Sequence, residues 1–497
     1  MRSGSADPLF VGVDVSTGQV RALCCGPDGT VHARAVAELP SPVRPQPGAA
    51  EQDARSWWPA TVTALMRVTT SLGLRRKHIR ALAITSTSGT VVAVDRRGRP
   101  LGPAVMYDDA RARSEAATAA FAGRDRWARL GVRVGPTFGP GRIARLLSEH
   151  RGQEVFRVCH TADLLAWRLV GAPTALDWSH ALRSGYDVLA GEWALEAFDA
   201  LGADLGLLPT VLPPTTPVGA IGASAAARTG LPRGCEIRLG MTDGCTGQLA
   251  GGGTLPGSFV SVLGTTLVVK GISRTLIRDP GGPVYSHRLP DGHWMPGGAS
   301  NTGGEALATW PAARRPVLDA AARARGPASV VCYPLARTGE RFPFAVPEAR
   351  GFTTGIPDGE VDAYRAALEG VAFVERLAYD CLGGLDAPVN RVFTAGGGNR
   401  SEAWLRIRAT VLGRPIEPVA QAESAFGAAM LASVGSAHRG LPEATAAMVR
   451  TGPVIEPCAA EQAALEDRYG RFVAELAQRG WWSGSVRPEA RSATGVG

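Results

Sequence analysis

The chain of 497 residues (51.8 kDa) is too long for a single hydrophobic core and suits two large domains. Its 45% hydrophobic and 20% charged residues are ordinary for a globular protein, and no apolar run approaches the ~18 residues of a membrane helix. The net charge of +8 is spread along the chain rather than gathered into a stripe, which argues against a nucleic-acid partner.

The numbers and positions of lysine and cysteine exclude further classes of protein. Lysine occurs only at Lys77 and Lys270, and no Gly-Lys-Ser/Thr tripeptide exists, so a Walker-type phosphate loop is excluded. The eight cysteines form no C-x-x-C pair and the N-terminus has no signal-peptide pattern, so neither a zinc site nor a disulfide framework is expected. We therefore expect a cytoplasmic enzyme without a membrane partner.

The first half of the chain opens with a strand, a polar turn and another strand. The turn runs from Asp14 to Gly18, between apolar residues 9–13 and 20–23. Apolar periodicity then predicts a third strand over 30–37, a helix over 55–72, two strands within 80–94, and helices over 114–122, 141–150 and 162–169.

The opening pattern recurs near residue 258, where strand 258–263 is followed by the turn Gly264-Thr265-Thr266 and strand 267–269. Beyond it we expect a strand over 389–394 and helices over 360–382, 401–412 and 456–477. The repeated pattern predicts two similar α/β domains, 1–250 and 251–482, facing each other across a catalytic cleft. A disordered tail is predicted over 483–497.

Each repeated turn has the size and polarity of a phosphate-binding loop. Backbone N–H groups of a tight turn can bind an anion, Thr17 can donate to a phosphate oxygen, and Asp14 at a strand end can reach magnesium. Alone, either turn is also an ordinary hairpin. Their pairing, one turn in each domain, favours the phosphate interpretation.

Two further segments have residue types suited to catalysis or nucleotide binding. Asp243 stands among small residues after an apolar strand, where it can enter a pocket as a general base or simply cap a helix. The run Gly396-Gly397-Gly398 lies between a strand and a helix, where a nucleotide can approach the backbone, although an ordinary loop fits as well.

Taken in order, these segments resemble the FGGY family of carbohydrate kinases over roughly residues 9–435. Further stretches carry the resemblance: residues 46–53 (QPGAAEQD) before Trp57-Trp58, 107–112 (YDDARA), 177–181 (DWSHA) with Asp187 and Gly191-Glu192-Trp193, 396–404 (GGGNRSEAW), 412–415 (LGRP) and 423–429 (ESAFGAA). The resemblance implies two actin-like (ribonuclease H-like) domains, ATP and Mg²⁺ as cofactors, and a small sugar as substrate.

The resemblance also implies a role for each matching position. Asp14 would bind magnesium and face the substrate, and Asp243 would be the general base that also bonds the acceptor sugar. The implied ATP and phosphate contacts are Thr17, Gly18, Arg21, Gly264, Thr265, Thr266, Gly397, Gly398 and Ser401, with Trp404 near the adenine wall. The first turn departs from the family's D-x-G-T-T/S, because Ser16 replaces the glycine and Gly18 the second hydroxyl residue.

The run of small hydroxyl residues over 85–90 lies where family members contact the sugar. It lacks the Met-His of xylulokinases and the Arg-Glu of glycerol kinases, and is more similar to the D-ribulose kinase subgroup, whose stretch has an aspartate where Thr85 stands. We therefore expect a kinase of D-ribulose with Ser88 as a sugar ligand, and D-xylulose or glycerol as alternative acceptors. A solvent-facing strand edge is the other interpretation of this run.

Two rival classes remain on the same fold. A catalytically weak sugar-binding regulator would explain the altered first turn, since a fold does not fix a function. An actin-like or Hsp70-like ATPase has the same phosphate turns but would not need the stretches at 46–53 and 107–112. The sequence is compatible with a homodimer and does not determine the oligomeric state.

Overall fold

The computed structural model describes residues 7–280 and 282–483. The chain divides into two compact units. The first runs to Leu255 and adds Ser286–Met295 and Ala420–Arg450, while the second comprises Pro256–Tyr285, Pro296–Val419 and the chain from Thr451. These units interleave along the chain, unlike the predicted linear limits of 1–250 and 251–482. The tail predicted over 483–497 lies outside the described residues from residue 484 onward.

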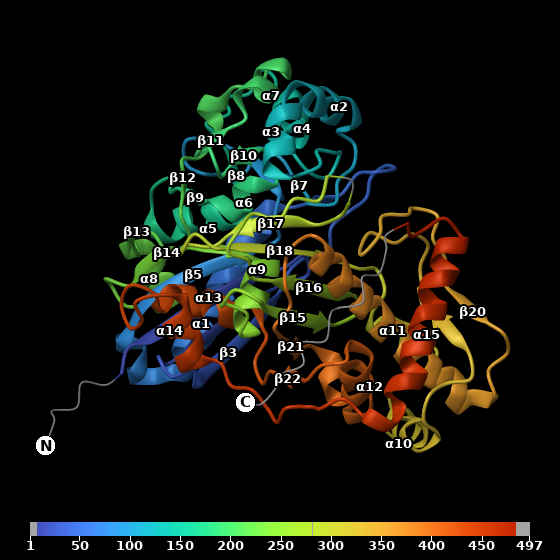
Figure 1. The fold of residues 1–497 in the computed structure, drawn as a ribbon. Helices are drawn as coiled ribbons and strands as arrows, with labels where there is room; N and C mark the ends of the chain where they lie inside the picture. Colours follow the sequence, from blue (N-terminus) through green and yellow to red (C-terminus); the bar gives the residue numbers. More distant parts are fainter. Residues whose placement is uncertain (1–6, 281, 484–497) are drawn as a thin grey trace, which may run out of the picture. The chain divides into compact units, whose positions relative to one another are not determined.

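The first unit is built on a six-stranded sheet of order β13-β14-β5-β1-β2-β3 (Figure 1). Its strands are β1 (Leu9–Val15), β2 (Gln19–Cys25), β3 (Val31–Glu38), β5 (Ile79–Ser86), β13 (Pro217–Ala220) and β14 (Glu236–Thr242). β1, β2 and β3 form an antiparallel meander, whereas β1, β5 and β14 run parallel. The strand–turn–strand opening predicted from the sequence is confirmed.

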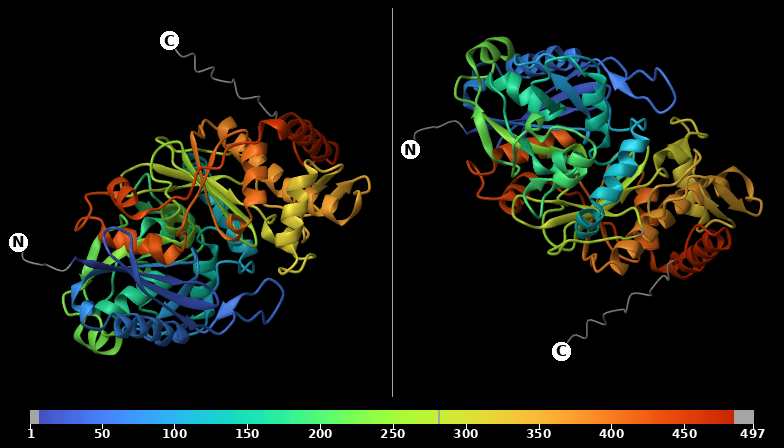
Figure 2. Two further views of the ribbon diagram at one scale, coloured as in Figure 1. Left: turned by 90° about the horizontal axis from the view of Figure 1, so that it is seen from below. Right: turned by 90° about the horizontal axis from the view of Figure 1, so that it is seen from above.

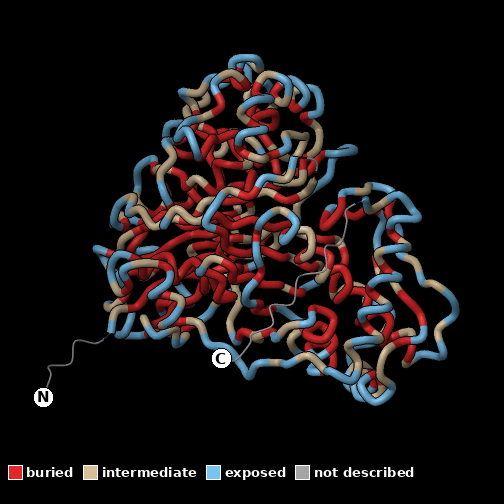
Figure 3. Tube along the Cα trace, viewed as in Figure 1, coloured by how far each residue is buried: buried red, intermediate tan, exposed pale blue. Residues whose placement is uncertain are grey.

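Helices cover both faces of this sheet, and β1 shows why. Leu9, Val11, Val13 and Val15 alternate into one core with residues of α1 (Trp57–Leu72) and α5 (Thr161–Val170). The intervening residues face α13 (Ser424–Ser433), which returns from the C-terminal half to pack on β1. Figure 2 shows α1 lying along the strands. In Figure 3, the region where Figure 1 draws this sheet is coloured mostly as buried.

Glycines allow α13 to approach the sheet at main-chain contact. A Cβ on Gly12 of β1 would lie 1.8 Å from the Ala425 carbonyl oxygen, and one on Gly427 would lie 1.9 Å from that of Thr246 in α9 (Asp243–Ala250). Any larger residue would push the elements apart. This packing brings α9 and β1 together, and is the physical reason why residues 420–450 belong to the first unit.

The remaining elements of the first unit are short. The strands β4, β7, β6 and β8 form a small separate sheet, and β9–β12 pair in twos. Their bounds, with those of the other helices, are β4 (Glu51–Gln52), β6 (Val91–Val94), β7 (Ala104–Val105), β8 (Arg157–His160), β9 (Leu176–Asp177), β10 (Tyr186–Asp187), β11 (Glu192–Trp193), β12 (Val211–Leu212), α2 (Arg113–Ala122), α3 (Arg124–Leu130), α4 (Gly141–Glu149), α6 (Trp178–Leu182), α7 (Leu195–Ala200), α8 (Ala223–Thr229) and α14 (Leu441–Met448).

A second six-stranded sheet repeats the plan, with the order β17-β18-β16-β15-β21-β22. The second unit contains β15 (Ser258–Leu263), β16 (Leu267–Gly271), β19 (Val331–Tyr333), β20 (Phe352–Thr354), β21 (Arg391–Ala395), β22 (Ile416–Pro418), α10 (Arg315–Arg325), α11 (Gly359–Gly384), α12 (Glu402–Leu412) and α15 (Ala459–Gln478). Most of β17 (Tyr285–Arg288) and the first two residues of β18 (Trp294–Ala299) fall within the stretch that is assigned to the first unit. One core joins the sheet to α11, α12 and α15. Across the described residues, no helix is long and apolar enough to cross a membrane.

Candidate active site

In the first unit, three parallel strands end side by side and carry the predicted acceptor-side residues. Asp14 of β1 is in register with Thr85 of β5, and Ser86 of β5 is in register with Thr242 of β14. Asp243 follows directly after β14. The carboxyl ends of parallel strands are the usual location of binding sites in α/β sheets, because the chain turns there and exposes side chains and main-chain groups.

Asp14 is a buried carboxylate with a strongly perturbed pKa. Its side chain is only 4% exposed, Oδ2 accepts a hydrogen bond from Arg21 Nη1 at 3.0 Å, and the buried Oδ1 has no hydrogen-bond partner. Burial and the nearby Asp243 raise its pKa to about 7, against the lowering effect of Arg21. Two carboxylates that repel each other around an unpartnered oxygen would be stabilised by a proton or a cation.

Asp243 is the first residue of α9, and the helix N-cap is Thr242. One carboxylate oxygen accepts from the Gly244 N–H at 2.6 Å. Its main-chain carbonyl accepts from Ser424 Oγ of α13 at 3.2 Å, so α13 holds this turn in place. The residue is half-buried, which leaves its carboxylate positioned but accessible.

The hydroxyl run 85–90, which begins in the last two residues of β5, is internal, and the alternative of a solvent-facing strand edge is wrong. Thr85, Ser86 and Thr90 are at most 1% exposed and Ser88 is 9% exposed. Thr85 Oγ1 bonds Thr246 Oγ1 of α9 at 2.9 Å, whereas the buried Ser88 Oγ has no partner. An unpartnered buried hydroxyl is costly unless a ligand completes its hydrogen bond.

Arg142, on α4, was not predicted from the sequence. It is 2% exposed, donates from Nη1 to the Met106 carbonyl at 3.2 Å, and has an Nε without a partner. Burial lowers its pKa to about 9. A Cβ on Gly89, which has a φ of +83°, would lie 2.4 Å from Arg142 Nη2. The guanidinium therefore lies beside the turn that carries Ser88. An arginine within a helix gave only a weak signal in the sequence.

The first turn is fixed by a residue outside it. Gln52 is buried and donates from Nε2 to the carbonyls of Thr17 and Pro40, at 2.7 Å each. Ser16 N–H and Oγ both donate to the Gln19 carbonyl at 3.0 Å. Gly18 has no left-handed φ, and a Cβ there would meet nothing within 4 Å. The turn thus owes its shape to Gln52 of the 46–53 stretch rather than to Gly18.

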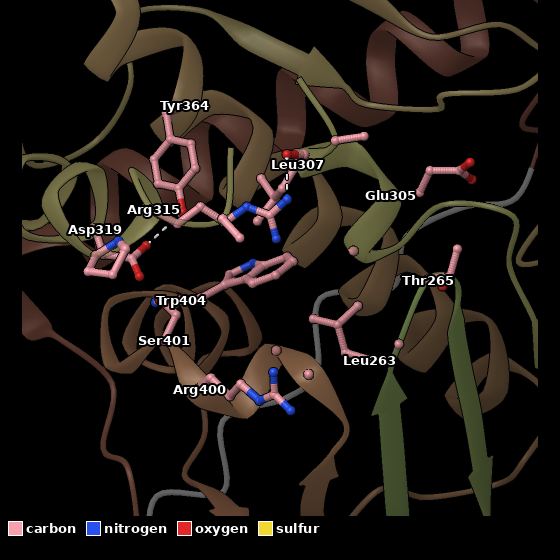
Figure 4. A pocket seen from close by; sticks show the side chains of 17 residues that line it. Leu263, Thr265, Glu305, Leu307, Arg315, Asp319, Tyr364, Arg400, Ser401 and Trp404 are labelled. Atoms are coloured by element: carbon pink, nitrogen blue, oxygen red, sulfur yellow. Dashed lines mark hydrogen bonds between the residues drawn. The ribbon is translucent and has the colours of Figure 1, made fainter. Parts of the chain in front are cut away.

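In the second unit, a pocket of about 510 Å³ gathers most of the predicted nucleotide residues (Figure 4). Its lining comprises Leu263, Gly264, Thr265, Gly304, Glu305, Leu307, Ala308, Ala312, Arg315, Pro316, Asp319, Tyr364, Gly397, Gly398, Arg400, Ser401 and Trp404. Thr266 lies outside this lining, and its carbonyl accepts from the Gly264 N–H at 3.0 Å. Volume and lining suit a ligand of nucleotide size.

One wall of the pocket is main chain. The Gly304 and Glu305 N–H groups donate to the carbonyls of Gly264 and Thr265 at 2.8 and 3.1 Å, which braces the turn after β15. Gly396 has a φ of +93°, and a Cβ there would lie 2.5 Å from the Leu263 carbonyl oxygen. Glycine is therefore required for the loop to reach the strand end.

The opposite wall is the start of α12. Ser401 caps this helix by accepting the Trp404 N–H at 3.0 Å, and a helix N-terminus favours negative charge. Trp404 anchors its indole by donating from Nε1 to the Leu368 carbonyl at 3.0 Å, and its ring extends into the pocket below Arg315 (Figure 4). Glycine backbone, a flat aromatic surface and a capped helix end together suit a nucleotide.

Comparison with known proteins agrees with this geometry. Residues 9–250 match the N-terminal domain, and residues 259–436 the C-terminal domain, of the FGGY family of carbohydrate kinases. The chain is 26% identical to a glycerol kinase of Polaromonas naphthalenivorans (90% of this chain, 95% of that protein) and 29% identical to a xylulose kinase of Streptomyces coelicolor (93% and 95%).

Among solved structures, the xylulose kinase from Rhodospirillum rubrum superposes with a TM-score of 0.85 at 29% identity, over 95% of this chain and 99% of that one. The predicted fold class of two actin-like (ribonuclease H-like) α/β domains is thereby confirmed. Both family models match in order and cover most of the chain. The protein therefore belongs to the FGGY family of carbohydrate kinases, enzymes that use ATP to phosphorylate small sugars.

Proposed function

We propose that the protein transfers the γ-phosphoryl group of ATP to a hydroxyl of a five-carbon ketose, with Asp243 as general base. The observation that carries this proposal is the edge where β1, β5 and β14 end, because it joins Asp14, the Ser88 turn and Asp243. A positioned carboxylate beside unpartnered buried donors is what an acceptor hydroxyl needs.

Each side chain has one role in the proposed reaction. Asp243 accepts the proton of the attacking hydroxyl, whose oxygen forms a bond to the γ-phosphorus as the bond to the β–γ bridging oxygen breaks and ADP leaves. In the second unit, the Gly264–Thr265 turn and the α12 N-terminus hold phosphate oxygens, and Trp404 supports the adenine ring of ATP. Thr17, Thr266 and Arg21 complete the proposed phosphate contacts.

Magnesium fits the residues present. Asp14 offers a hard oxygen ligand, and its buried Oδ1 lacks a partner. No cluster of three or more His, Cys, Asp or Glu side chains suited to a metal occurs within 7–280 and 282–483, so one or two carboxylates would share the ion with phosphate oxygens. When bound, magnesium neutralises charge on the β- and γ-phosphates.

D-ribulose is the acceptor that we propose first. The buried hydroxyl of Ser88 and the guanidinium of Arg142 beside Gly89 are donors without a full set of partners. Sites built to pair sugar hydroxyls discriminate strongly against a wrong hydroxyl pattern. The chain also lacks the Met-His pair of xylulokinases in this turn.

D-xylulose is a second candidate, favoured by the likeness to xylulose kinases at 29% identity. The two ketoses differ only in configuration at C3. The acceptor is therefore decided by whether the C3 hydroxyl meets the donors of the Ser88 turn.

A coupled ADP-release assay with D-ribulose, D-xylulose, L-ribulose, D-gluconate and glycerol tests the proposal. We expect D-ribulose to give the highest kcat/KM. A tenfold lead of D-xylulose or glycerol would overturn the ribulose assignment and leave the kinase intact. Sugar binding by calorimetry without ADP release for any acceptor would instead favour the sugar-binding regulator.

We also propose the cytoplasm as the site of action. Seven cysteines (Cys24, Cys25, Cys159, Cys235, Cys332, Cys381 and Cys458) are thiols outside any disulfide. Such thiols persist in reducing compartments, which also supply ATP.

A further inference from the structure

A buried glutamate of the second unit has no role in the reaction described above. Glu340 is 3% exposed and stands in the segment that follows β19. Its main chain forms an isolated antiparallel bridge with Val346, in which each N–H donates to the other residue's carbonyl at 2.9 Å. A buried carboxylate on a backbone fixed in this way requires hydrogen-bond donors around it.

Five donors surround this carboxylate. Oε2 accepts the hydroxyls of Ser300, Thr302 and Tyr333 at 2.8, 2.9 and 2.9 Å. Oε1 accepts the N–H groups of Asn301 and Arg341 at 2.6 and 2.9 Å. Because all five partners donate, the set matches a carboxylate, which only accepts, and does not match a side-chain amide, which must also donate.

Three of the five donors lie in one loop, which we call the brace loop (residues 300–305). Its first part is bound to the start of β16, because the Ser300 N–H donates to the Leu267 carbonyl at 2.8 Å and the Leu267 N–H donates to the Thr302 carbonyl at 2.9 Å. Within the loop, the Thr302 N–H donates to Ser300 Oγ at 2.9 Å. Glu340 therefore holds the loop at the residues that contact β16.

The second part of the brace loop contacts the proposed phosphate turn. The N–H groups of its last two residues donate to the two carbonyls of the Gly264–Thr265 turn, at 2.8 and 3.1 Å. A Cβ on Gly303 would lie 2.5 Å from Thr266 Cα, so the loop is in main-chain contact with the turn. Glu305 and the turn line the same pocket (Figure 4). The position of the turn thus depends on the loop that Glu340 holds.

A second link between the brace loop and the segment of Glu340 is exposed. Arg337 pairs with Glu305 at 2.5 Å, and the two side chains are 51% and 30% exposed. Exposed ion pairs stabilise little, because water screens them and both side chains lose freedom. The three hydroxyl bonds to Glu340 are buried, and bonds to an ionised group are the stronger kind. Glu340 is therefore the main anchor of the loop.

We propose that Glu340 is a positioning residue for ATP, which fixes the brace loop and, through it, holds the Gly264–Thr265 turn ready to receive phosphate oxygens. The inference rests on the proposed function, which assigns phosphate oxygens to this turn. A turn that is ordered before ATP arrives loses less conformational entropy on binding. Glu340 itself is outside the pocket lining, so its effect is confined to the phosphate end of the nucleotide.

The test compares the affinities for ADP and for adenosine, measured by calorimetry on the whole protein. ADP has phosphates for the turn and adenosine has none, while both carry the ring that contacts the rest of the pocket. In Glu340→Gln, an amide N–H₂ group must face donors. We expect Kd for ADP to rise about tenfold and Kd for adenosine to stay within about twofold of the wild type. KM for the sugar should not change.

Asp362→Asn is the matched control. Asp362 is also a fully buried carboxylate of the second unit, and it accepts the N–H and the hydroxyl of Ser329 at 2.9 and 2.5 Å. Its other partners are Arg325 and the Asp358 N–H, and all three residues lie outside the brace loop and the pocket lining. We expect this variant to lose stability without any change in Kd for ADP.

Two further variants keep Glu340 and guard against a Glu340→Gln protein that does not fold. Thr302→Val and Tyr333→Phe each remove one hydroxyl that lies 2.9 Å from the same oxygen, Oε2. Thr302 belongs to the brace loop, whereas Tyr333 belongs to β19. We expect Thr302→Val to weaken ADP binding by about threefold or more and Tyr333→Phe to leave it unchanged.

Four outcomes would overturn the inference. An unchanged Kd for ADP in Thr302→Val does so whether or not Glu340→Gln folds. An equal loss of ADP and adenosine affinity means that the whole pocket is disturbed, and an equal loss of ADP affinity in Glu340→Gln and Asp362→Asn means a general loss of stability. A wild type that binds no ADP removes the proposed function and this inference with it, whereas the first three outcomes leave the proposed function intact.

Discussion

The acceptor-side edge of the first unit and the pocket of the second unit differ in the groups that they present to a ligand. At the edge, side chains dominate: Asp14 and Asp243 are carboxylates in mutual repulsion, and Ser88 is a buried donor without a partner. In the pocket, glycine backbone and a capped helix end meet an aromatic surface. Proton transfer requires titratable groups with shifted pKa values, whereas holding a nucleotide requires close main-chain approach.

The difference predicts how each region responds to substitution. Changes at the edge should reduce turnover while leaving ATP binding intact. Changes in the pocket should weaken ATP binding while leaving the chemical step intact once ATP is saturating.

The largest effect is expected for Asp243→Asn. Loss of a positioned general base costs roughly 10²–10⁴-fold in kcat, and the variant should keep its fold because Asp243 is only half-buried and an asparagine oxygen can still accept the Gly244 N–H. Steady-state kinetics and circular dichroism together check this. More than about a tenth of wild-type turnover would remove Asp243 from the mechanism, and an unchanged KM for ATP is the internal control.

Asp14→Asn should come next and should act through the metal. An amide at this position is a weaker magnesium ligand than a carboxylate, so the Mg²⁺ concentration for half-maximal activity should rise about tenfold or more. Titration with Mg²⁺ at saturating ATP and sugar measures it. Full wild-type activity in excess EDTA would contradict a magnesium requirement altogether.

In the pocket, Gly398→Val should raise KM for ATP by about tenfold with a kcat near that of the wild type. A Cβ at this position would lie 2.5 Å from Leu263 Cδ2, so the loop or the Leu263 side chain, both in the pocket lining, must move. Gly383→Val is a suitable control on α11, since a Cβ there meets nothing within 4 Å. Equal loss of ATP and sugar affinity in Gly398→Val would mean that the two regions are not separable in this way.

Local sequence patterns predicted the strands and helices that carry the acceptor-side edge and the pocket. Polar turns after apolar strands placed Asp14 correctly near the end of β1 and Gly264 correctly between β15 and β16. The pocket also contains Gly397, Gly398, Ser401 and Trp404. These residues could be predicted because a glycine run before a helix is a local sequence signal.

What the sequence could not supply depends on distant contacts. The return of α13 to β1 rests on Gly12 and Gly427 meeting main chain far away in sequence. Arg142 reaches the Ser88 turn through the fold, and no local pattern distinguishes it from the many surface arginines. Likewise, nothing near Glu340 in sequence reveals that its carboxylate accepts hydrogen bonds from residues 300–302.

The smallest effect concerns stability and follows from the pKa of Asp14. Its folded pKa of about 7 lies above the ordinary 3.8, so between these values the folded state holds a proton that the unfolded state has lost. The free energy of unfolding therefore falls as pH rises from about 4 to 7, by at most ~1.4 kcal/mol per pH unit from this group. Asp14→Asn carries no such charge, so in EDTA its Tm relative to wild type should be higher at pH 8 than at pH 5. Asp53→Asn, at an exposed carboxylate whose pKa is lowered by its bonds to Arg55, should not show this rise. A pH-independent Tm difference for Asp14→Asn would mean that Asp14 is already ionised in the folded protein, and burial would then not distinguish this carboxylate from an exposed one.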